Sequence, residues 1–280
     1  MVMPATPDLM PPPPPRPFVP RIGGTAMPGG VHFSSGNYGT GPNHLLFLTG
    51  VAIMGLGAAA VSLAYVVVAL AGYFTGLPLS DAFMDLAGGA DVAHLPLVMV
   101  AKNLVIFLSF LVVLRLSPMS GYHGAEHKVV SCLEVYGALD PQLVWSCSRV
   151  HRRCGTTLLA GFLPVPFVAV PLLAWPVYGP AAAIAVVAIG WYTRFWVGAA
   201  IQAIFTTKEP TQRQMDAALR AGHLLLERWN RDPYRKLPLW RSIWVRGFPQ
   251  MFAGVIVAVQ LLSWLQTQLP FWMDFGHVLH

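Results

Sequence analysis

Charged side chains are scarce in this sequence: only 11% of its 280 residues are Asp, Glu, Lys or Arg, whereas an average soluble domain carries about 25%. A soluble protein of this size could not cover its surface with so few charges, and 55% of the residues are hydrophobic. Low charge and high hydrophobicity also exclude a disordered regulator, despite 25 prolines and 26 glycines. Three cysteines are too few for a disulfide-rich secreted scaffold. We therefore predict an integral membrane protein.

The apolar residues gather in runs long enough to span a bilayer, which requires about 20 residues. They predict an all-α, polytopic helical membrane protein with about five transmembrane helices and a cytoplasmic helical segment. The runs are roughly Leu45–Phe74, Leu95–Leu116, Thr157–Tyr178, Pro180–Phe205 and Phe248–Leu269. Four glutamines interrupt the fifth run. Four prolines in the third predict kinks, and a pair of re-entrant halves is the alternative there.

Lysine and arginine are absent from two segments, Gly76–His94 and the tail after Leu269. Apart from Lys102 and Arg194, which fall inside apolar runs, every basic residue lies on one side of the predicted membrane. The positive-inside rule then gives a cytoplasmic N-terminus and an external C-terminus. All three cysteines would face the reducing cytoplasm. Because Met1–Arg16 is rich in proline rather than apolar, we expect no cleavable signal peptide.

These patterns divide the chain into six segments. They are a Pro/Gly-rich extended cytoplasmic tail (1–43), the first two transmembrane helices (44–116), a cytoplasmic polar segment (117–156), the third and fourth helices (157–205), a basic amphipathic cytoplasmic segment (206–247), and the fifth helix with an external tail (248–280). Within the basic segment, apolar residues recur at helical spacing over Pro210–Trp229. That helix is expected to lie on the membrane surface or to pack on the polar segment.

Candidate chemistry begins with two histidines in the polar segment. His123 and His127 are one helical turn apart, so both imidazoles could reach one metal ion. Glu126 lies close to the same face and could serve as a ligand or as the catalytic general base. The order H-x-x-E-H is that of inverted zincins. The alternative is a hydrogen-bonded structural cluster at the membrane surface.

A second group of candidates lies just before the third apolar run. His151 and Cys154 could complete a tetrahedral metal site, because zinc accepts mixed nitrogen and sulfur ligands. The sequence does not show that the two segments meet. For Cys154 the alternative is a buried thiol that acts as a small apolar side chain.

Several motifs of this chain resemble the YqhQ-like family of bacterial membrane proteins, which is described as predicted metal-dependent enzymes. The motifs are Gly121–Lys128 (GYHGAEHK), Cys132–Glu134 (CLE), His151–Thr156 (HRRCGT), Ile201–Gln202, Thr206–Pro210 (TTKEP) and Met215–Leu219 (MDAAL), with a fainter glycine motif at Gly23–Met27 (GGTAM). The resemblance covers about Gly23 to Leu219. It implies a bacterial cytoplasmic (inner) membrane location and a metal-dependent activity.

The chain also departs from what the family resemblance leads one to expect. An acidic residue should follow the first glycine motif, where this chain has Pro28-Gly29-Gly30. A Tyr-Glu pair expected in the fourth helix reads Tyr192-Thr193. The proline-rich tail and the part after Trp229 look like additions. Loss of acidic groups and gain of extra segments favour recruitment into an assembly.

Three functions are consistent with these observations. The first is an integral membrane subunit of a larger membrane complex with a structural or accessory role, built on the YqhQ-like fold. The second is a zinc-dependent membrane hydrolase whose site faces the cytoplasm. The third is a transporter-like protein, suggested by the intramembrane charges of Lys102 and Arg194. Membrane lipids and other membrane subunits are the expected partners, and no nucleic acid is expected.

Overall fold

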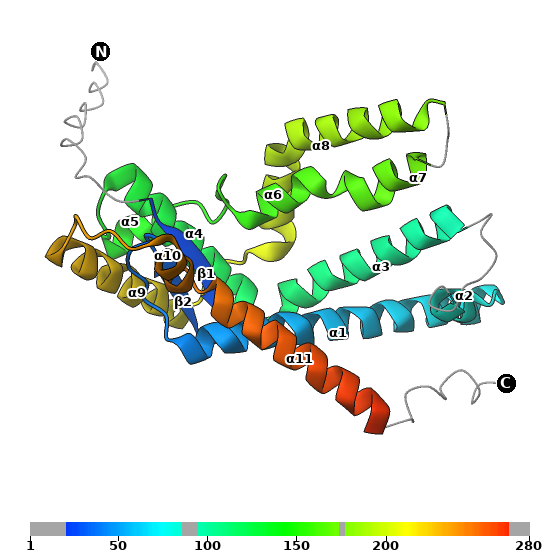
Figure 1. The fold of residues 1–280 in the computed structure, drawn as a ribbon, viewed down its shortest axis with the longest axis horizontal. Helices are drawn as coiled ribbons and strands as arrows, with labels where there is room; N and C mark the ends of the chain where they lie inside the picture. Colours follow the sequence, from blue (N-terminus) through cyan, green and yellow to red (C-terminus); the bar gives the residue numbers. More distant parts are fainter. Residues whose placement is uncertain (1–20, 86–94, 174–176, 269–280) are drawn as a thin grey trace, which may run out of the picture.

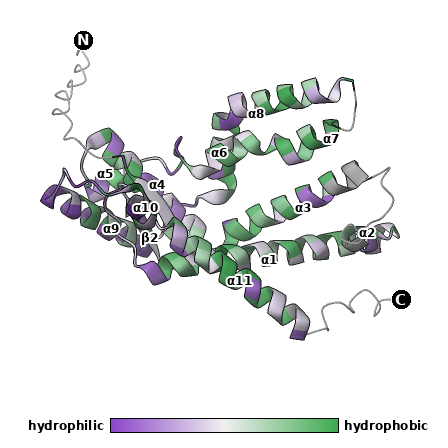
Figure 2. Ribbon diagram, viewed as in Figure 1, coloured by the Kyte–Doolittle hydropathy of each residue, from purple (hydrophilic) through white to green (hydrophobic). Residues whose placement is uncertain are grey.

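A computed structural model describes residues 21–85, 95–173 and 177–268 of the chain (Figure 1). A polar head lies at one end, and long apolar helices extend from it. Figure 2 shows the same division, with hydrophilic residues concentrated in the head. The architecture confirms the predicted helical, polytopic class and adds one small β-hairpin. The head contains β1 (Gly23–Met27), β2 (Gly30–Ser34), α4 (Met119–Tyr136), α5 (Pro141–Ser146), α9 (Gln212–Arg231) and α10 (Leu239–Val245).

The apolar helices follow the predicted runs closely. They are α1 (Asn43–Thr75), α3 (Leu95–Leu116), α6 (Gly155–Phe162) with the π-helix η1 (Val165–Ala169) and α7 (Val170–Leu172), α8 (Gly179–Ile201) with the π-helix η2 (Gln202–Thr206), and α11 (Phe248–Gln268), while the short α2 (Leu79–Asp85) follows α1. Within the described residues, four helices are long and apolar enough to cross a bilayer. The count is five if α3 and α4, which meet at a bend of 75°, form one broken span. Because the hairpin, α5 and α9 pack around α4, we place α4 in the head.

The proline-rich third run forms one candidate span, Gly155–Leu172. Proline lacks the N–H that an α-helix needs and clashes with the preceding turn. The π-helix η1, which follows Pro164 and contains Pro166, accommodates this loss by locally widening the helix. The described residues 155–172 therefore continue as a helix rather than separating into two halves.

The extended tail predicted for residues 1–43 is wrong over its described part, because residues 23–34 form an antiparallel hairpin. Pro28 and Gly29 form its two-residue turn, in which Gly29 has a φ of 88° that favours glycine. Val31 and Phe33 on β2 are buried in the head core. Each strand has only five residues, and it is buried by helices that are distant in sequence. The local composition, rich in proline and glycine, therefore predicted an irregular tail instead of strands. Residues 1–20 of the predicted tail lie outside the described residues.

The core of the head lies between α4, the hairpin and α9. Phe33, Val129, Met215 and Leu225 are fully buried there. The apolar face of α9 therefore packs on the hairpin and α4, which was one of the two predicted positions for this amphipathic helix. A capping box formed by Thr211 and Gln214 starts α9.

The fifth predicted span joins the apolar bundle through small residues. Helix α11 crosses α1 where Gly50 faces the backbone carbonyl of Met251 and Gly254 faces that of Phe47. A Cβ at either glycine would overlap the opposite backbone. Such close approach through glycines is typical of helix pairs in membranes.

Candidate metal centre

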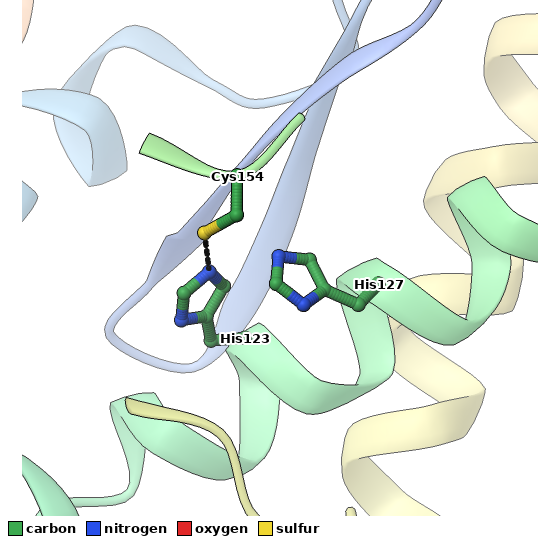
Figure 3. A group of neighbouring side chains, drawn as sticks. All are labelled: His123, His127 and Cys154. Atoms are coloured by element: carbon green, nitrogen blue, oxygen red, sulfur yellow. Dashed lines mark hydrogen bonds between the residues drawn. The ribbon is translucent and has the colours of Figure 1, made fainter. Parts of the chain in front are cut away.

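Helix α4 brings the two histidines of the H-x-x-E-H pattern together, as their spacing predicts. The ring centroids of His123 and His127 are 4.3 Å apart, with one ring edge facing the other ring. Both rings point to the same side of α4 (Figure 3). His127 is buried and His123 is partly buried.

Cys154 reaches the histidines from the loop before α6 (Figure 3). Its Sγ lies 3.3 Å from Nε2 of His123. One ligand atom from each of His123, His127 and Cys154 lies within 4.8 Å of the others, which makes this a group that could hold a metal ion. Cys154 is also the N-cap of α6, where its sulfur accepts a hydrogen bond from the backbone N–H of Thr156.

Backbone carbonyls fix the orientation of both imidazoles. Nδ1 of His123 donates to the carbonyl of Thr206 (2.9 Å), and Nδ1 of His127 donates to the carbonyl of Arg149 (2.7 Å). A carbonyl oxygen can only accept, so Nδ1 carries the proton in both rings and the Nε2 lone pair is left for a ligand. Metal-binding histidines almost always donate their other N–H in this way.

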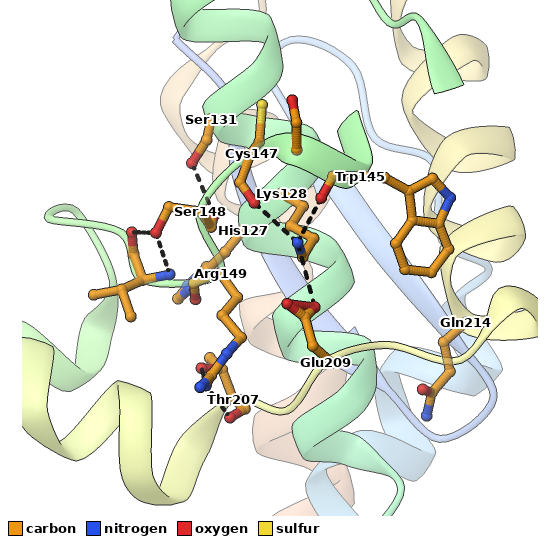
Figure 4. A network of polar contacts seen from close by, with 12 residues as sticks. His127, Lys128, Ser131, Trp145, Cys147, Ser148, Arg149, Thr207, Glu209 and Gln214 are labelled. Atoms are coloured by element: carbon orange, nitrogen blue, oxygen red, sulfur yellow. Dashed lines mark hydrogen bonds and ion pairs between the residues drawn. The ribbon is translucent and has the colours of Figure 1, made fainter. Parts of the chain in front are cut away.

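Side-chain contacts tie together the segments that carry these two carbonyls. The guanidinium of Arg149 donates from Nη1 to the carbonyls of Ala203 (2.9 Å) and Thr207 (2.7 Å), so the loop before α6 is tied to η2. Buried Lys128 donates to the carbonyls of Trp145 (2.8 Å) and Cys147 (3.0 Å) and pairs with Glu209 (3.3 Å). Figure 4 shows this network around His127. Three of its members, Lys128, Thr207 and Glu209, belong to the family-like motifs, which thereby acquire a positioning role.

Two further motif residues let the segments approach each other. Gln202, almost fully buried, accepts from the backbone N–H of His151 (2.8 Å) and donates to Thr157 (3.0 Å). A Cβ at Gly124 would overlap the carbonyl oxygen of Lys208. Gly124 therefore allows the chain after η2 to pass directly beside α4, although glycine disfavours the helix itself.

Glu126 lies beside the ligand group rather than within it. Burial raises the pKa of its carboxyl to about 7, although the neighbouring His123 opposes the shift. Strand β1 covers this carboxyl: the backbone of Ala26 donates to it, and a Cβ at Gly24 would overlap it. The faint glycine motif of the sequence thus forms a wall of the site. The sequence could not predict this role, because β1 contacts Glu126 through its backbone and not through its side chains.

Burial also determines the charge of the candidate ligands. Burial, with a smaller contribution from the adjacent His123, lowers the pKa of His127 to about 3, so its imidazole is neutral near neutral pH. Burial raises the pKa of the Cys154 thiol, against hydrogen bonds from Thr156 and Thr157 that lower it. A metal ion must displace that proton, because the thiolate is the ligand.

His151, the other predicted ligand, has different partners. Its Nε2 lies 3.0 Å from a carboxylate oxygen of Glu134, and its Nδ1 accepts from the backbone N–H of Arg153 (3.3 Å). The ring is 5.8 Å from that of His127, centroid to centroid. His151 therefore lies near the group formed by His123, His127 and Cys154, with both nitrogens engaged.

A cavity of about 400 Å³ opens onto the candidate ligands. His123, Glu126, His127 and Cys154 line one part of it, and β1 residues 23–26 line another. Leu114, Met119, Val130 and Leu159 add apolar surface. The site therefore combines a metal-competent group, a carboxyl and room for a ligand.

Comparison with known proteins supports the resemblance inferred from the motifs. A family model described as "Protein of unknown function (DUF1385)" matches residues 51–189. The "Uncharacterized protein YqhQ" of Bacillus subtilis (strain 168) is 34% identical over 61 residues, which are 20% of this chain and 19% of that protein. Over residues 51–189 the chain thus matches a YqhQ-like family. No solved structure matches it.

The family match includes both segments that carry the predicted site residues. Residues 51–189 contain α4, the loop that carries Cys154, and the candidate span that follows it. The hairpin that covers Glu126 and the helix α9 lie outside the matched residues. This YqhQ-like chain thus encloses the matched site with elements from both flanks.

Proposed function

We propose that this YqhQ-like protein is a zinc-dependent membrane hydrolase whose site lies in the polar head. The observation that carries the proposal is the convergence of His123, His127 and Cys154, with Nδ1 of both histidines bound to backbone carbonyls. Two imidazoles and one thiolate are a donor set that zinc accepts, and three protein ligands leave a fourth position open. Catalytic zinc sites keep such a position.

The residues around the ligand group would serve in proton transfer and in positioning. Zinc held there would supply a Lewis acid. Glu126 is placed to take a proton from a water molecule on a carboxylate oxygen and to return it to the leaving group. Gly24 and Ala26 of β1 hold this carboxyl against the site, and the hairpin keeps bulk water from that side.

The hydrolytic step can be tested without a known substrate. The full-length chain, loaded with zinc, is incubated with total membrane extract, and mass spectrometry identifies molecules that gain water and split. Glu126→Gln is the matched variant because it keeps the shape and leaves the three ligands unchanged. We expect products with the parent protein and none with E126Q. Equal products from both, or products independent of zinc, would contradict the proposal.

A second function, an integral membrane subunit of a larger complex, is supported by a different observation. The head exposes Tyr234 (89%), Leu239 (78%) and Trp240 (64%) around the start of α10. Large apolar side chains gathered on a polar head are typical of a contact with another protein or with a membrane. Crosslinking in native membranes, followed by gentle purification, would identify fixed partners. Their absence, with the protein running as a monodisperse monomer, would contradict this role.

The two intramembrane charges do not favour the transporter-like alternative. Lys102 donates to the carbonyl of Phe83 (2.7 Å) and lies over its ring. The guanidinium of Arg194 lies over the rings of Trp191 (4.1 Å) and Phe195 (4.2 Å) and donates to the Trp191 carbonyl. Each charge therefore has a local structural role.

We also propose the orientation given by the basic residues: a multi-pass protein of the bacterial inner membrane with a cytoplasmic head and N-terminus and an external C-terminus. The support is that the head holds most of the basic residues of the described chain and lies at one end of the candidate spans (Figure 1).

A further inference from the structure

A second cavity, of about 420 Å³, lies beside the metal centre and shares the wall formed by Ile22 to Thr25. Three arginines from distant parts of the chain line it: Arg21 before β1, Arg153 before α6 and Arg246 after α10. Arg153 also lines the first cavity, which opens onto the candidate metal ligands. The arginine cavity, as we call it, therefore adjoins the candidate site directly.

The positive charge of the arginine cavity is only partly balanced. Burial lowers the pKa of Arg153, and the positive charge of Arg21 lowers it further, which places these two guanidinium groups near each other. Glu134 pairs with Arg153. Among the described residues no acidic side chain lines the cavity, and Arg21 and Arg246 have no ion pair. An anion would reduce this mutual repulsion.

Two hydroxyl groups line the same cavity. Ser34 accepts a hydrogen bond from the backbone N–H of Gly36 (3.0 Å), and Ser35 accepts one from that of Tyr38 (3.3 Å). With their oxygens accepting, both hydroxyl protons remain to be donated. Guanidinium and hydroxyl donors together match the acceptor oxygens of a phosphate group.

The hairpin holds Arg246 at this position. The imidazole of His32 accepts from the backbone N–H of Gly41 (2.7 Å), so its Nε2 donates to the carbonyl of Val245 (3.1 Å), next to Arg246. A Cβ at Gly36 would come within 3.1 Å of Nη2 of Arg246. The guanidinium thus packs against the backbone of the segment that also carries the two serines.

The cavity lies level with the start of two candidate spans. Arg153 comes two residues before Gly155, the first residue of α6, and Arg246 comes two residues before Phe248, the first residue of α11. Phe248 itself lines the cavity. Basic side chains just outside a span lie at the depth of lipid headgroups.

We propose that the arginine cavity binds the phosphate group of an amphiphile, with a membrane phospholipid as the source that its depth favours. The proposal does not rest on the metal centre. It adds a binding site beside that centre, because a phosphate held there would bring the rest of the same molecule to the shared wall at Ile22–Thr25.

The test measures binding of detergent-solubilised phosphatidic acid and of diacylglycerol, which lacks only the phosphate, to the full-length protein. We expect phosphatidic acid to bind and diacylglycerol not to bind. Arg21→Gln and Arg246→Gln should each weaken phosphatidic acid binding about tenfold or more, because each removes charge-assisted hydrogen bonds. Arg220→Gln is the matched control, since Arg220 is exposed on α9 and does not line the cavity.

Equal binding of the two lipids, or equal weakening by R220Q, would overturn the proposal. His123→Ala should keep the affinity for phosphatidic acid; if it abolishes binding while the protein remains folded, the phosphate is held by the metal centre and the arginine cavity is not the site. Glycerol 3-phosphate distinguishes the two sources of phosphate. Binding as tight as that of phosphatidic acid indicates a soluble ligand, and much weaker binding indicates the lipid; both outcomes support a phosphate site if R21Q and R246Q weaken it.

Discussion

At the residue scale, Cys154 combines two roles that are chemically separable. Its sulfur belongs to the candidate ligand group, and the same atom caps the N-terminus of α6. Serine is among the preferred N-cap residues. Replacing sulfur with oxygen therefore keeps the cap and removes the soft ligand.

Cys154→Ser should lower zinc affinity by more than the roughly 10–100-fold that loss of an outer-shell partner costs, because a direct ligand is lost. To compare the parent protein with C154S, each is incubated with a chelator of known affinity, and elemental mass spectrometry measures the zinc that the protein retains. Cys147→Ser is the control, because Cys147 is partly buried, lies at the end of α5 and does not belong to the group. Unchanged zinc retention in C154S would show that the sulfur of Cys154 is not a zinc ligand.

His32 makes the stability of the head depend on pH. Burial lowers its pKa from 6.5, so on acidification the unfolded chain binds the proton before the folded chain does. The stabilisation is complete above the unfolded pKa and is lost as pH falls through the folded one. His32→Gln should therefore lose less stability than the parent protein between about pH 7 and pH 5. Thermal unfolding at several pH values measures this, and His223→Gln, at an exposed position, should behave like the parent protein; identical pH dependence in all three proteins would contradict it.

Side-chain chemistry was predictable from the sequence, and backbone chemistry was not. The spacing of His123 and His127 predicted their convergence, and Cys154 was named as a downstream candidate. The acceptors that orient the rings are the carbonyls of Thr206 and Arg149, to which any residue type could contribute. These acceptors therefore could not be predicted from the residue types.

At the element scale, long apolar helices were predictable and the short hairpin was not. Runs of about 20 apolar residues have few alternatives to a span. Strands β1 and β2 have five residues each, and their burial depends on α4 and α9, more than 80 residues away. The strands could be recognised only by the turn signal at Pro28-Gly29, which composition alone assigned to an irregular tail.

Strand β1 offers a matched pair of glycines for testing its contact with the site. Gly24→Ala should lower the stability by about 1–3 kcal/mol, because its methyl group would overlap the buried Glu126 side chain. Gly23→Ala should have little effect, since the nearest atom to a Cβ there is a backbone oxygen at 3.9 Å. The apparent melting temperatures of the two detergent-solubilised variants show which substitution costs more stability. A larger loss for G23A than for G24A would contradict the packing of β1 on Glu126.

At the scale of the whole molecule, the head and the candidate spans have separate chemistry. The head holds the candidate metal centre, the arginine cavity and most of the basic residues, and the spans expose apolar side chains. In the proposed membrane arrangement, this division puts the site at the membrane surface, where it could meet an amphiphile without extracting it fully from the bilayer. The side of the membrane then decides which pool of substrates is available.

Orientation is tested by cysteine labelling in sealed cells with a reagent that does not cross membranes. A cysteine at Asp81, exposed on α2, should react before permeabilisation, because α2 lies in the segment without basic residues. A cysteine at Gln212, exposed on α9, should react only after permeabilisation. The reverse pattern would place the head outside.

The central claim is a metal centre made by His123, His127 and Cys154, and X-ray absorption at the zinc edge of the full-length, zinc-loaded protein tests it most directly. We expect one zinc per chain, with one sulfur at about 2.3 Å and two nitrogens at about 2.0–2.1 Å, and loss of the sulfur contribution in C154S. A protein that binds no zinc at equivalence, or a zinc shell without sulfur in the parent protein, would contradict the account.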